Sequence, residues 1–477
     1  MTREISRQTF LRGAAGALAA GAVFGSVRAV AEPLASGWDA LSTAIGGPLL
    51  LPNNPQFGAA KQVFNTNYNS STPAAIVTPT SLADVQKAMA FAASHKMQVA
   101  PRSGGHSYIG ASTANGALVF DLRQLPGGIN YDAASGRVTA TPATSLWDLH
   151  QTLAASARGI PTGICPTVGA AGHALGGGLG AQSRHAGLLS DALTSASVVL
   201  PGGQAVTASA AENPDLFWAL RGGGGGNFGV TTSLTFATFP IADSDVVNVH
   251  FPTESFAAVL VGWQNWLRTA DRSNWALADS TTDATGTHCR IMATCPAGSG
   301  NSVAGAVAKA VGVQPTGTDV QTFNYLDLVK YLAGNMNPAP LSYVGGSDVL
   351  PDINAGAAQG IAAAVNAFPA GAGRMLAIMH TLDGALASVA PGATAFPWRR
   401  QSALVQWYIE PAGSPSAAVN WLATAHKAVA PYSVGGYVNY VEAGQPPARY
   451  FGSNLSKLSA VRQKYDPGRV MFSGLNF

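Results

Sequence analysis

The sequence predicts an α+β protein of two domains. The chain has 477 residues, which is more than one domain usually contains, and 47% of them are apolar against 11% charged. Short apolar strands, helices and glycine-rich loops alternate in the first half. From Val246 to Leu422 the chain is instead richer in Trp and in strands of alternating polarity. We therefore expect a second domain to begin near Pro240.

The first half contains strands, helices and loops in close succession. A polar, turn-rich stretch occupies residues 56–73, and Ser81 is the expected N-cap of a helix because Asp84 follows it by three residues. Strands are expected at Ala74–Thr78, Gln98–Pro101, Leu118–Asp121, Arg137–Thr141 and Val230–Phe239, and further helices at Ser145–Ala157 and Glu212–Leu220.

The second half predicts an antiparallel sheet backed by helices. Alternating strands are expected at Arg374–His380 and Leu404–Ile409, with a helix at Phe256–Ala270 and an aromatic, strand-like segment at Tyr432–Glu442. Pro and Gly clusters at 338–340, 369–373 and 391–392 mark connections. We assign residues 32–240 to the first domain, 241–430 to the second, and 431–477 to a C-terminal return to the first.

The N-terminus has the composition of an export signal, assigned to residues 1–31. Arg3, Arg7 and Arg12 precede a small apolar run at Gly13–Gly25, and Ala29-Val30-Ala31 resembles a cleavage site. Ser6-Arg7-Gln8-Thr9-Phe10-Leu11 resembles a twin-arginine signal whose second Arg is replaced by Gln. We expect an exported, periplasmic or secreted protein, most consistent with a twin-arginine-type route.

The net charge argues against two classes of partner, and the cysteine spacing argues against a disulfide. The formal net charge is +3 with no Lys/Arg-rich run, which argues against nucleic acid and anionic membranes. Of the three cysteines, Cys289 and Cys295 share a strand-like segment. Their sulfurs would lie roughly 20 Å apart at about 3.3 Å per residue, so we expect two buried thiols rather than a disulfide. Cys165 lies in a glycine loop.

Three glycine tracts indicate a closely approached ligand. Gly176-Gly177-Gly178-Leu179-Gly180-Ala181 matches G-x-G-x-x-A, but no apolar strand precedes it and no acidic residue follows about 20 positions later, so a Rossmann site is disfavoured. No Gly-Lys-Ser/Thr follows any tract, which excludes a Walker A loop. Successive backbone N–H groups in such loops bind pyrophosphate without a Lys.

His106 and Cys165 are the candidates for bonds to a flavin. Each alone is more often a structural residue, but each stands in a glycine loop, followed by a third tract at Gly222–Gly226. His173 lies eight residues after Cys165, with no second ligand pair of suitable spacing, so a zinc site is disfavoured and no metal is expected. No G-x-S-x-G elbow indicates a serine hydrolase.

These motifs resemble one family over nearly the whole mature chain. Arg102-Ser103-Gly104-Gly105-His106-Ser107-Tyr108, Cys165-Pro166-Thr167-Val168-Gly169, Gly172-His173-Ala174-Leu175-Gly176-Gly177-Gly178, the stretch from Trp218 to Val230 and Lys464-Tyr465-Asp466-Pro467 are similar to those of berberine bridge enzyme-like FAD oxidases. The resemblance implies a two-domain PCMH-type (vanillyl-alcohol-oxidase-type) FAD-binding fold with an inserted substrate domain of antiparallel sheet and helices.

The resemblance also implies a bicovalent FAD, bonded to His106 and Cys165. His173 would lie near the flavin pyrimidine or ribityl region, and Val168 would line the approach of dioxygen to the ring. The cofactor-binding residues it implies are His106, Cys165, Arg102, Ser103, Gly104, Gly105, Ser107, Val168, Gly169, Gly172, His173, Gly176, Gly177, Gly178, Gly229, Val230 and Asn439.

Three catalytic residues follow from the same resemblance. Gly436-Tyr437-Val438-Asn439-Tyr440 matches the family's tyrosine-bearing segment, with Tyr440 as the base, and Gln406 and Tyr108 match pocket positions. A free phenol has a pKa of about 10, so nearby cations or hydrogen bonds would have to lower it. The alternative is that Tyr437 and Tyr440 are half-buried sheet aromatics. His185 stands where plant members often carry Tyr.

The expected reaction is removal of a hydride from a C–OH group, with dioxygen as the electron acceptor and hydrogen peroxide as a product. The first substrate hypothesis is the anomeric carbon of an oligosaccharide, giving a lactone, with Trp263, Trp266, Trp398 and Trp407 as candidate sugar-stacking residues or, alternatively, core. The second is oxidation or cyclisation of a phenolic, alkaloid or polyketide metabolite. The third, a flavin-binding protein without turnover, is disfavoured by the intact His106, Cys165 and Tyr440.

Overall fold

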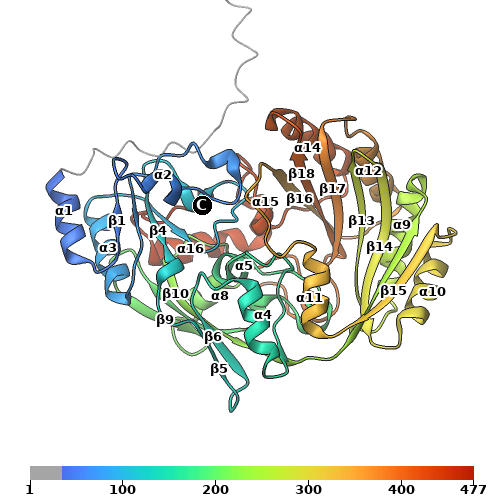
Figure 1. The fold of residues 1–477 in the computed structure, drawn as a ribbon, viewed down its shortest axis with the longest axis horizontal. Coiled ribbons are helices and arrows are strands. Elements are labelled where there is room, and N and C mark those ends of the chain that lie inside the picture. Colours follow the sequence, from blue (N-terminus) through green and yellow to red (C-terminus); the bar gives the residue numbers. More distant parts are fainter. Residues whose placement is uncertain (1–34) are drawn as a thin grey trace, which may run out of the picture.

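The computed structural model describes residues 35–477, so the expected export signal at 1–31 lies outside the described residues. Figure 1 shows the blue-to-green first half and the red helix α16 (Leu455–Tyr465) on one side of the molecule. The yellow-to-brown strands and helices of residues 244–429 lie on the other. The C-terminal segment thus returns to the first half, and the α+β class predicted from the sequence is confirmed.

A small sheet opens the fold and positions the first glycine loop. Its strand order is β1-β2-β4-β3, with β2 and β3 both parallel to β4. Ser81 caps α3 by accepting a hydrogen bond from the Asp84 amide, as its spacing predicted. The elements are α1 Ala35–Ala44, β1 Leu49–Leu50, β2 Ala75–Val77, α3 Leu82–Ser94, β3 Val99–Arg102 and β4 Leu118–Asp121.

An antiparallel sheet completes the first half. Its order is β5-β6-β10-β8-β9, and a core of apolar residues joins it to α4, α5, α8 and α16. The strands are β5 Ile129–Asp132, β6 Arg137–Ala140, β8 Leu193–Val199, β9 Ala205–Ser209 and β10 Val230–Ala237, with β7 Arg158–Gly159 paired to β11 Phe239–Pro240. The helices are α4 Leu146–Ala154, α5 Ala170–Leu175 and α8 Pro214–Leu220.

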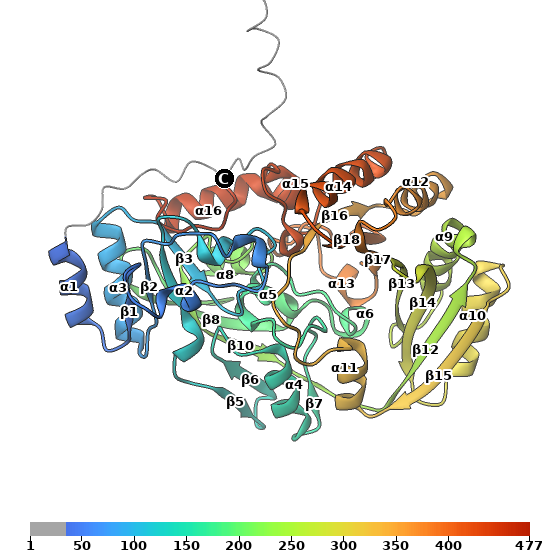
Figure 2. The same ribbon diagram turned by 45° about the horizontal axis from the view of Figure 1, so that its top comes forward.

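The second half is built on one seven-stranded antiparallel sheet. Its order is β15-β12-β14-β13-β17-β18-β16, and Figure 2 shows α9, α10, α12 and α14 together on the far side of this sheet from the first half. The strands are β12 Ser244–Phe251, β13 Trp275–Asp283, β14 Gly286–Pro296, β15 Gly317–Phe323, β16 Val344–Leu350, β17 Gly373–Thr381 and β18 Ala403–Pro411. The helices are α9 Phe256–Leu267, α10 Gly300–Val311, α12 Ala355–Asn366 and α14 Pro415–Val429.

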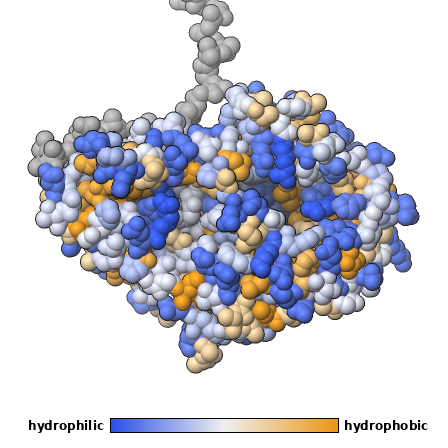
Figure 3. Space-filling model, in the orientation of Figure 1, coloured by the Kyte–Doolittle hydropathy of each residue, from blue (hydrophilic) through white to orange (hydrophobic). Residues whose placement is uncertain are grey.

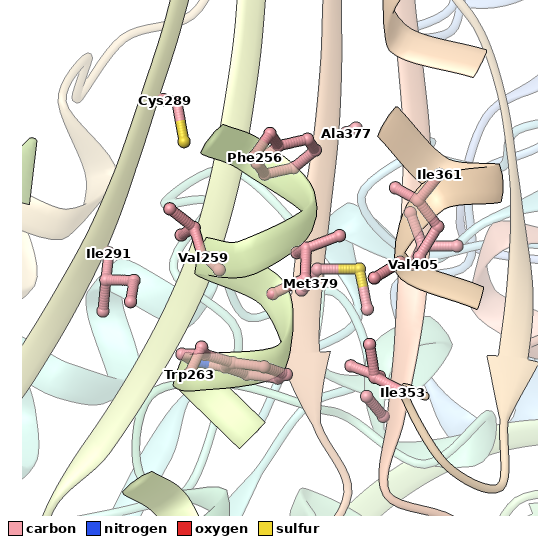
Figure 4. Close-up of a cluster of buried hydrophobic side chains, with 14 of the residues drawn as sticks. Phe256, Val259, Trp263, Cys289, Ile291, Ile353, Ile361, Ala377, Met379 and Val405 are labelled. Carbon is pink, nitrogen blue, oxygen red and sulfur yellow. The ribbon is translucent and has the colours of Figure 1, made fainter. Parts of the chain in front are cut away.

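Alternation along the strands separates a core face from a cavity face. Figure 4 shows Phe256, Val259 and Trp263 of α9 packed against the sheet, close to Met379 of β17 and Ile291 of β14. Because side chains alternate across a strand, the neighbours of the core residues on β17 and β18 point the other way, toward the first half. The site is built on this second face.

Of the two interpretations of four tryptophans, sugar-stacking residues or core, the second is confirmed. Trp263, Trp266, Trp398 and Trp407 are at most 6% exposed, and none of them lines the cavity described below. Their large apolar rings fill the cores instead. Cys289 and Cys295 are free and buried, as predicted. Figure 3 shows hydrophilic and hydrophobic residues interspersed over one face of the molecule, and within residues 35–477 no helix meets the length and apolarity that a membrane span requires.

The strand predicted at Tyr432–Glu442 does not form. Gly435 makes a single bridge to Val349, and the chain then turns into the 3-10 helix η5, Val438–Tyr440. The Tyr437 amide donates to Ser347 Oγ at 2.9 Å instead of to a strand partner, and the Tyr440 amide donates to the Tyr437 carbonyl. The turn brings the rings of Tyr437 and Tyr440 to one side, with centroids 5.0 Å apart.

Shorter helices and turns connect these elements. The remaining helices are α2 Phe57–Ala60, α6 Ser183–Ala186, α7 Leu189–Ala192, α11 Tyr325–Ala333, α13 Ala385–Ser388 and α15 Ala448–Phe451. Besides η5, the 3-10 turns are η1 Thr66–Tyr68, η2 Ala111–Thr113, η3 Leu122–Gln124, η4 Thr253–Ser255 and η6 Gly452–Asn454.

A buried charge cluster anchors the return segment to the large sheet. His426 of α14 bonds to Asp348 through Nδ1 and to Glu442 through Nε2, both at 2.7 Å. Arg449 adds a contact of 2.9 Å to Asp348. Burial by itself lowers the pKa of His426, but the hydrogen bonds and charges of Asp348 and Glu442 outweigh it and raise the pKa to about 9. A charged His426 therefore holds together the carboxylates of Asp348 and Glu442, and Glu442 follows Tyr440 by two residues.

This cluster should make a pH-dependent contribution to the free energy of unfolding. Because the folded pKa of His426 lies above its ordinary value of about 6.5, the stabilisation is complete below that value and is lost as the pH rises through about 9. His426→Gln should lower the free energy of unfolding by roughly 3 kcal/mol near pH 6, and the difference from wild type should vanish above pH ~9. Urea denaturation of both proteins at a series of pH values measures the free energy of unfolding.

His185→Gln is the control for this prediction. His185 is exposed on α6, where its ring contacts Phe239. The free energy of unfolding of His185→Gln should show no comparable pH-dependent difference from that of wild type. An equal loss for His426→Gln at pH 6 and pH 10 would contradict the charge argument.

Candidate active site

A single cavity of about 710 Å³ lies between the glycine loops and the open face of the seven-stranded sheet. Its walls come from the loop after β3, the loop before α5, the tract before β10, strands β13, β17 and β18, and the return segment. Of the residues predicted from sequence, it brings together Ser103, Gly104, Gly105, His106, Ser107, Tyr108, Cys165, Val168, Gly169, Gly172, His173, Gly229, Gln406, Asn439 and Tyr440.

Backbone contact joins the loop that carries His106 to the loop that carries Cys165. A Cβ on Gly169 would stand 2.0 Å from Ser103 Oγ, and a Cβ on Gly104 would stand 2.5 Å from the Gly169 nitrogen. Any side chain at either position would force the loops apart. The two glycines are therefore required for both candidate attachment residues to face one cavity.

Thr167 lies between the two candidate attachment residues. Its hydroxyl is 3.0 Å from His106 Nε2 and 3.9 Å from Cys165 Sγ. Phe64 stacks on the His106 ring, with centroids 4.1 Å apart. These contacts hold the imidazole in one orientation, with Nε2 turned toward Thr167.

Burial sets the charge state of these groups. It lowers the pKa of His106 to about 4, so the imidazole is neutral and keeps a lone pair at neutral pH. Burial also raises the pKa of the Cys165 thiol, although hydrogen bonds from Thr167 and Val168 act in the opposite direction. The neutral imidazole keeps a nucleophilic lone pair, whereas the Cys165 thiol has to lose its proton before the sulfur can form a bond.

His173 has a defined tautomer. Its Nε2 accepts a hydrogen bond of 2.7 Å from the Gly163 amide, so the proton of the neutral ring is on Nδ1. Burial lowers the pKa of His173 to about 4, and the neighbouring His150 adds to this effect. The Asn439 side chain donates to the His173 carbonyl at 3.0 Å and thereby ties α5 to the return segment.

The glycine-loop end of the cavity offers unsatisfied polar groups. No partner among residues 35–477 accepts from the backbone N–H groups of Gly104–Tyr108. Three side-chain oxygens of the wall, on Ser112, Asn227 and Thr231, are likewise buried without a protein partner. Because buried polar groups are normally paired, this end fits an anionic, many-atom ligand bound by neutral amides.

The sheet end of the cavity is rich in tyrosine. Tyr108 stacks on Tyr440 with centroids 5.3 Å apart, and Gln406 Nε2 donates to the Tyr108 hydroxyl at 2.7 Å. Tyr343 and Tyr408 form a second stacked pair at 5.1 Å. Burial raises the pKa of Tyr440 well above its ordinary value, and Tyr437 adds to this effect. The expected lowering of the Tyr440 pKa is thus absent.

Six predicted positions lie outside the cavity wall. Arg102 is buried and donates to the carbonyls of Ala60, Lys61 and Ser112, which makes it a support for the loop. The tract Gly176–Gly178 packs behind the wall against Tyr437 and Asn439. Val230 belongs to the core beside β4, and His185 is exposed. These residues do not line the cavity, and a contact of Arg102, Gly176, Gly177, Gly178 or Val230 with FAD stays a prediction.

Sequence reasoning missed several residues of the wall. Strand periodicity could have identified His380 and Tyr408 as wall residues. Tyr408 is two residues from Gln406 on the same strand, and His380 is the last residue of a predicted alternating strand. Arg374 and Glu410 face each other across β17 and β18 as an ion pair of 3.1 Å, and no other Lys, Arg, Asp or Glu of the described residues lines the cavity. Thr167 does not line the cavity but contacts both His106 and Cys165, and its place between Cys165 and Gly169 was its only signal in the sequence.

Comparison with known proteins agrees with this geometry. Residues 73–209 match the model of the FAD binding domain, and residues 436–472 match that of "Berberine and berberine like" proteins. The chitooligosaccharide oxidase of Gibberella zeae is 30% identical over 472 residues, which cover 87% of this chain and 90% of that protein.

Solved structures agree as well. The xylooligosaccharide oxidase of Myceliophthora thermophila C1 in complex with xylobiose superposes with a TM-score of 0.82 at 25% identity, over 91% of this chain and 98% of that one. The glucooligosaccharide oxidase of Acremonium strictum, described with a 6-S-cysteinyl, 8α-N1-histidyl FAD, shares the fold with a TM-score of 0.82 at 24% identity, over 91% and 98% of the two chains.

Fold and site together define an FAD-linked oxidoreductase. The chain belongs to the berberine bridge enzyme-like FAD oxidases of the PCMH-type fold. The resemblance inferred from the sequence motifs is confirmed, and FAD is the cofactor.

The contact between the two loops gives a prediction. Gly169→Ala should separate the His106 loop from the Cys165 loop and reduce the FAD bound per protein at least several-fold, because the new Cβ meets backbone and Ser103 within 2.5 Å. Gly305→Ala on α10, where a Cβ meets nothing within 4 Å, is the control and should bind FAD like wild type. Absorbance of purified protein at the flavin and protein bands measures the ratio; equal ratios would refute the contact argument.

Proposed function

We propose that this protein is an FAD-dependent oxidase of a carbohydrate C–OH group, most specifically the anomeric carbon of an oligosaccharide, giving a lactone. Dioxygen is the proposed electron acceptor and hydrogen peroxide the second product. The observation that carries the proposal is the shared cavity, in which the loops of His106 and Cys165 face a tyrosine-rich wall across one space.

His106 and Cys165 are the proposed attachment residues. Both line the cavity, both contact Thr167, and the His106 imidazole is neutral. The free amides of Gly104–Tyr108 would bind the pyrophosphate, and His173 Nδ1–H would donate toward the electron-rich edge of the ring. Val168 and Gly169 line the same end. The flavin, when bound, accepts the hydride that the substrate carbon gives up.

Tyr440, Gln406 and Tyr108 are the proposed groups at the reacting carbon. Tyr108 and Tyr440 stack at the sheet end, and Gln406 fixes the Tyr108 hydroxyl. Tyr440 takes the proton of the substrate hydroxyl while the walls exclude water and orient the C–H bond. The pKa of Tyr440 is raised, so this phenol accepts the proton only by passing its own onward.

The sugar assignment is supported by the chemistry of the wall and by the named relatives. Tyr343 and Tyr408 present aromatic faces, against which the C–H faces of a sugar ring pack, and Arg374 and Glu410 offer charged hydrogen-bonding groups to its hydroxyls. The relatives above are oxidases of chito-, xylo- and glucooligosaccharides.

Export and domain organisation remain part of the proposal. We propose that residues 1–31 direct export, with residues 32–240 and 431–477 forming the FAD-binding domain around the substrate domain at 241–430. The positions of the seven-stranded sheet and of η5 are consistent with this division. An exported enzyme meets oligosaccharides outside the cell, whereas a pathway enzyme for an aromatic metabolite needs no signal.

Anaerobic bleaching of the bound flavin tests the proposed substrate. Xylo-, cello- and chitooligosaccharides should abolish the oxidised flavin absorbance within seconds to minutes, and the corresponding alditols, which lack the anomeric hydroxyl, should not. Phenolic metabolites form the second arm of the panel. Bleaching by phenolics alone would overturn the carbohydrate assignment in favour of an oxidase of aromatic metabolites.

Single-tether variants test the attachment residues. His106→Ala and Cys165→Ala should each retain one covalent flavin bond, and the double variant should release its FAD on denaturation. Proteolysis of wild type should yield one flavin that joins the peptides of both loops, and mass spectrometry counts the bonds. Cys295→Ala, a buried thiol of β14, is the control and should keep both. Covalent flavin in the double variant would refute the assignment.

A further inference from the structure

Tyr440 needs a partner that takes up the proton it receives from the substrate. Tyr440 is buried against Tyr108 and Tyr437, and its pKa is raised. The only Lys or Arg side chain that lines the cavity within residues 35–477 is Arg374, which is paired with Glu410. The described cavity wall therefore offers no unpaired Lys or Arg to stabilise a phenolate at Tyr440, and the proton needs another acceptor.

His380 is positioned to be that group. It stands on the cavity face of β17, and its ring centroid lies 6.3 Å from that of Tyr440. No hydrogen bond joins the two side chains directly in the part of the chain that the structure describes, so the proton would cross through one bridging water or after a small side-chain rotation. His380 is part-buried and lines the same end of the cavity as Gln406 and Tyr108.

A chain of hydrogen bonds sets the tautomer of His380. The Gln406 amide nitrogen donates to the Tyr108 hydroxyl at 2.7 Å, so its amide oxygen faces His380. That oxygen only accepts, so His380 Nε2, at 3.0 Å, carries the proton. The lone pair of the neutral ring is therefore on Nδ1, which has no partner among the described residues.

The charge state agrees with the geometry. Burial lowers the pKa of His380, and the hydrogen bond to Gln406 offsets this only in part. The ring is therefore neutral at neutral pH and able to accept a proton. Tyr108, Tyr408 and Tyr343 face the same space from the loop after β3, from β18 and from the segment before β16, and burial raises the pKa of each. Glu410 is the one carboxylate among the described residues that lines the cavity.

We propose that His380 is a further catalytic residue, the terminal acceptor of the substrate's hydroxyl proton, with Tyr440 as the relay. This rests on the proposed function. The substrate O–H bond breaks as its proton bonds to the Tyr440 oxygen, and the phenolic proton of Tyr440 passes to His380 Nδ1. The hydride of the C–H bond leaves to the flavin, and a carbonyl forms. His380 then returns its proton to solvent when the product leaves.

The decisive variant is His380→Gln. Glutamine still donates to Gln406 but accepts no proton. We expect the rate of anaerobic flavin reduction at saturating substrate to fall by about 100-fold or more, with bound FAD unchanged. In wild type this rate should fall as the pH drops through the pKa of His380, below about 6.5, because the protonated ring is no acceptor. This acid limb should be absent in His380→Gln, and its persistence there would overturn the proposal.

Three further variants exclude a purely structural explanation. His380→Glu restores a proton acceptor and should recover part of the lost rate. Glu410→Gln should retain the acid limb, which separates His380 from the one carboxylate of the wall. His288→Gln, at an exposed position near the start of β14, should behave like wild type throughout. Equal losses for His380→Gln and His380→Glu would indicate packing rather than proton transfer, against the proposal.

A readout independent of turnover comes from ¹⁵N-labelled histidine. The difference spectrum between wild type and His380→Gln at pH 7 should show one ring with a protonated Nε2 and a bare Nδ1. An imidazolium or an Nδ1–H tautomer would refute the assignment. If no sugar bleaches the flavin of the wild type, only the carbohydrate assignment is refuted. The tautomer of His380 is measured without substrate, so that test still applies. The reduction rates of the variants are then compared with the substrate that does bleach the flavin.

Discussion

The site depends on one backbone contact, the approach of Gly104 to Gly169. Neither position has room for a Cβ, and the contact fixes where His106 and Cys165 stand although they are far apart in the chain. Residues 104–108 line the cavity, and their amides have no acceptor among the described residues. The close approach requires glycine at both positions. It also places the attachment residues and the anion-binding amides of an FAD site next to one another.

The substrate side is held by the return of the chain after the large sheet. Gly345 and Gly346 of β16 leave room for Tyr108 and Glu442, since a Cβ at these positions would lie 2.7 Å and 2.4 Å from those side chains. Glu442 belongs to the buried cluster with His426 and Asp348. Burying charged groups is unfavourable. The charges of this cluster lie behind the site, where they position η5, and the cavity wall carries only one ion pair.

Burial has opposite consequences for the two kinds of titratable group in the cavity. It raises the pKa of the tyrosines and lowers the pKa of the histidines, so both are neutral at physiological pH. Neutral histidines keep a lone pair, and neutral phenols keep a proton to relay. A site of this kind moves protons along hydrogen bonds and needs no stable phenolate or imidazolium in the resting state.

The sequence by itself determined the local elements, the glycine loops and the paired His106 and Cys165, because capping, strand alternation and glycine requirements act over a few residues. Only the tertiary structure decided which predicted residues reach the cavity. Arg102 and Gly176–Gly178 carry family motifs yet support the wall from behind, and Tyr432–Glu442 turns because Ser347 and Val349 take its backbone bonds. His380 became a candidate only once β17, β18 and η5 were placed together, since no local pattern specifies a contact between residues 60 positions apart.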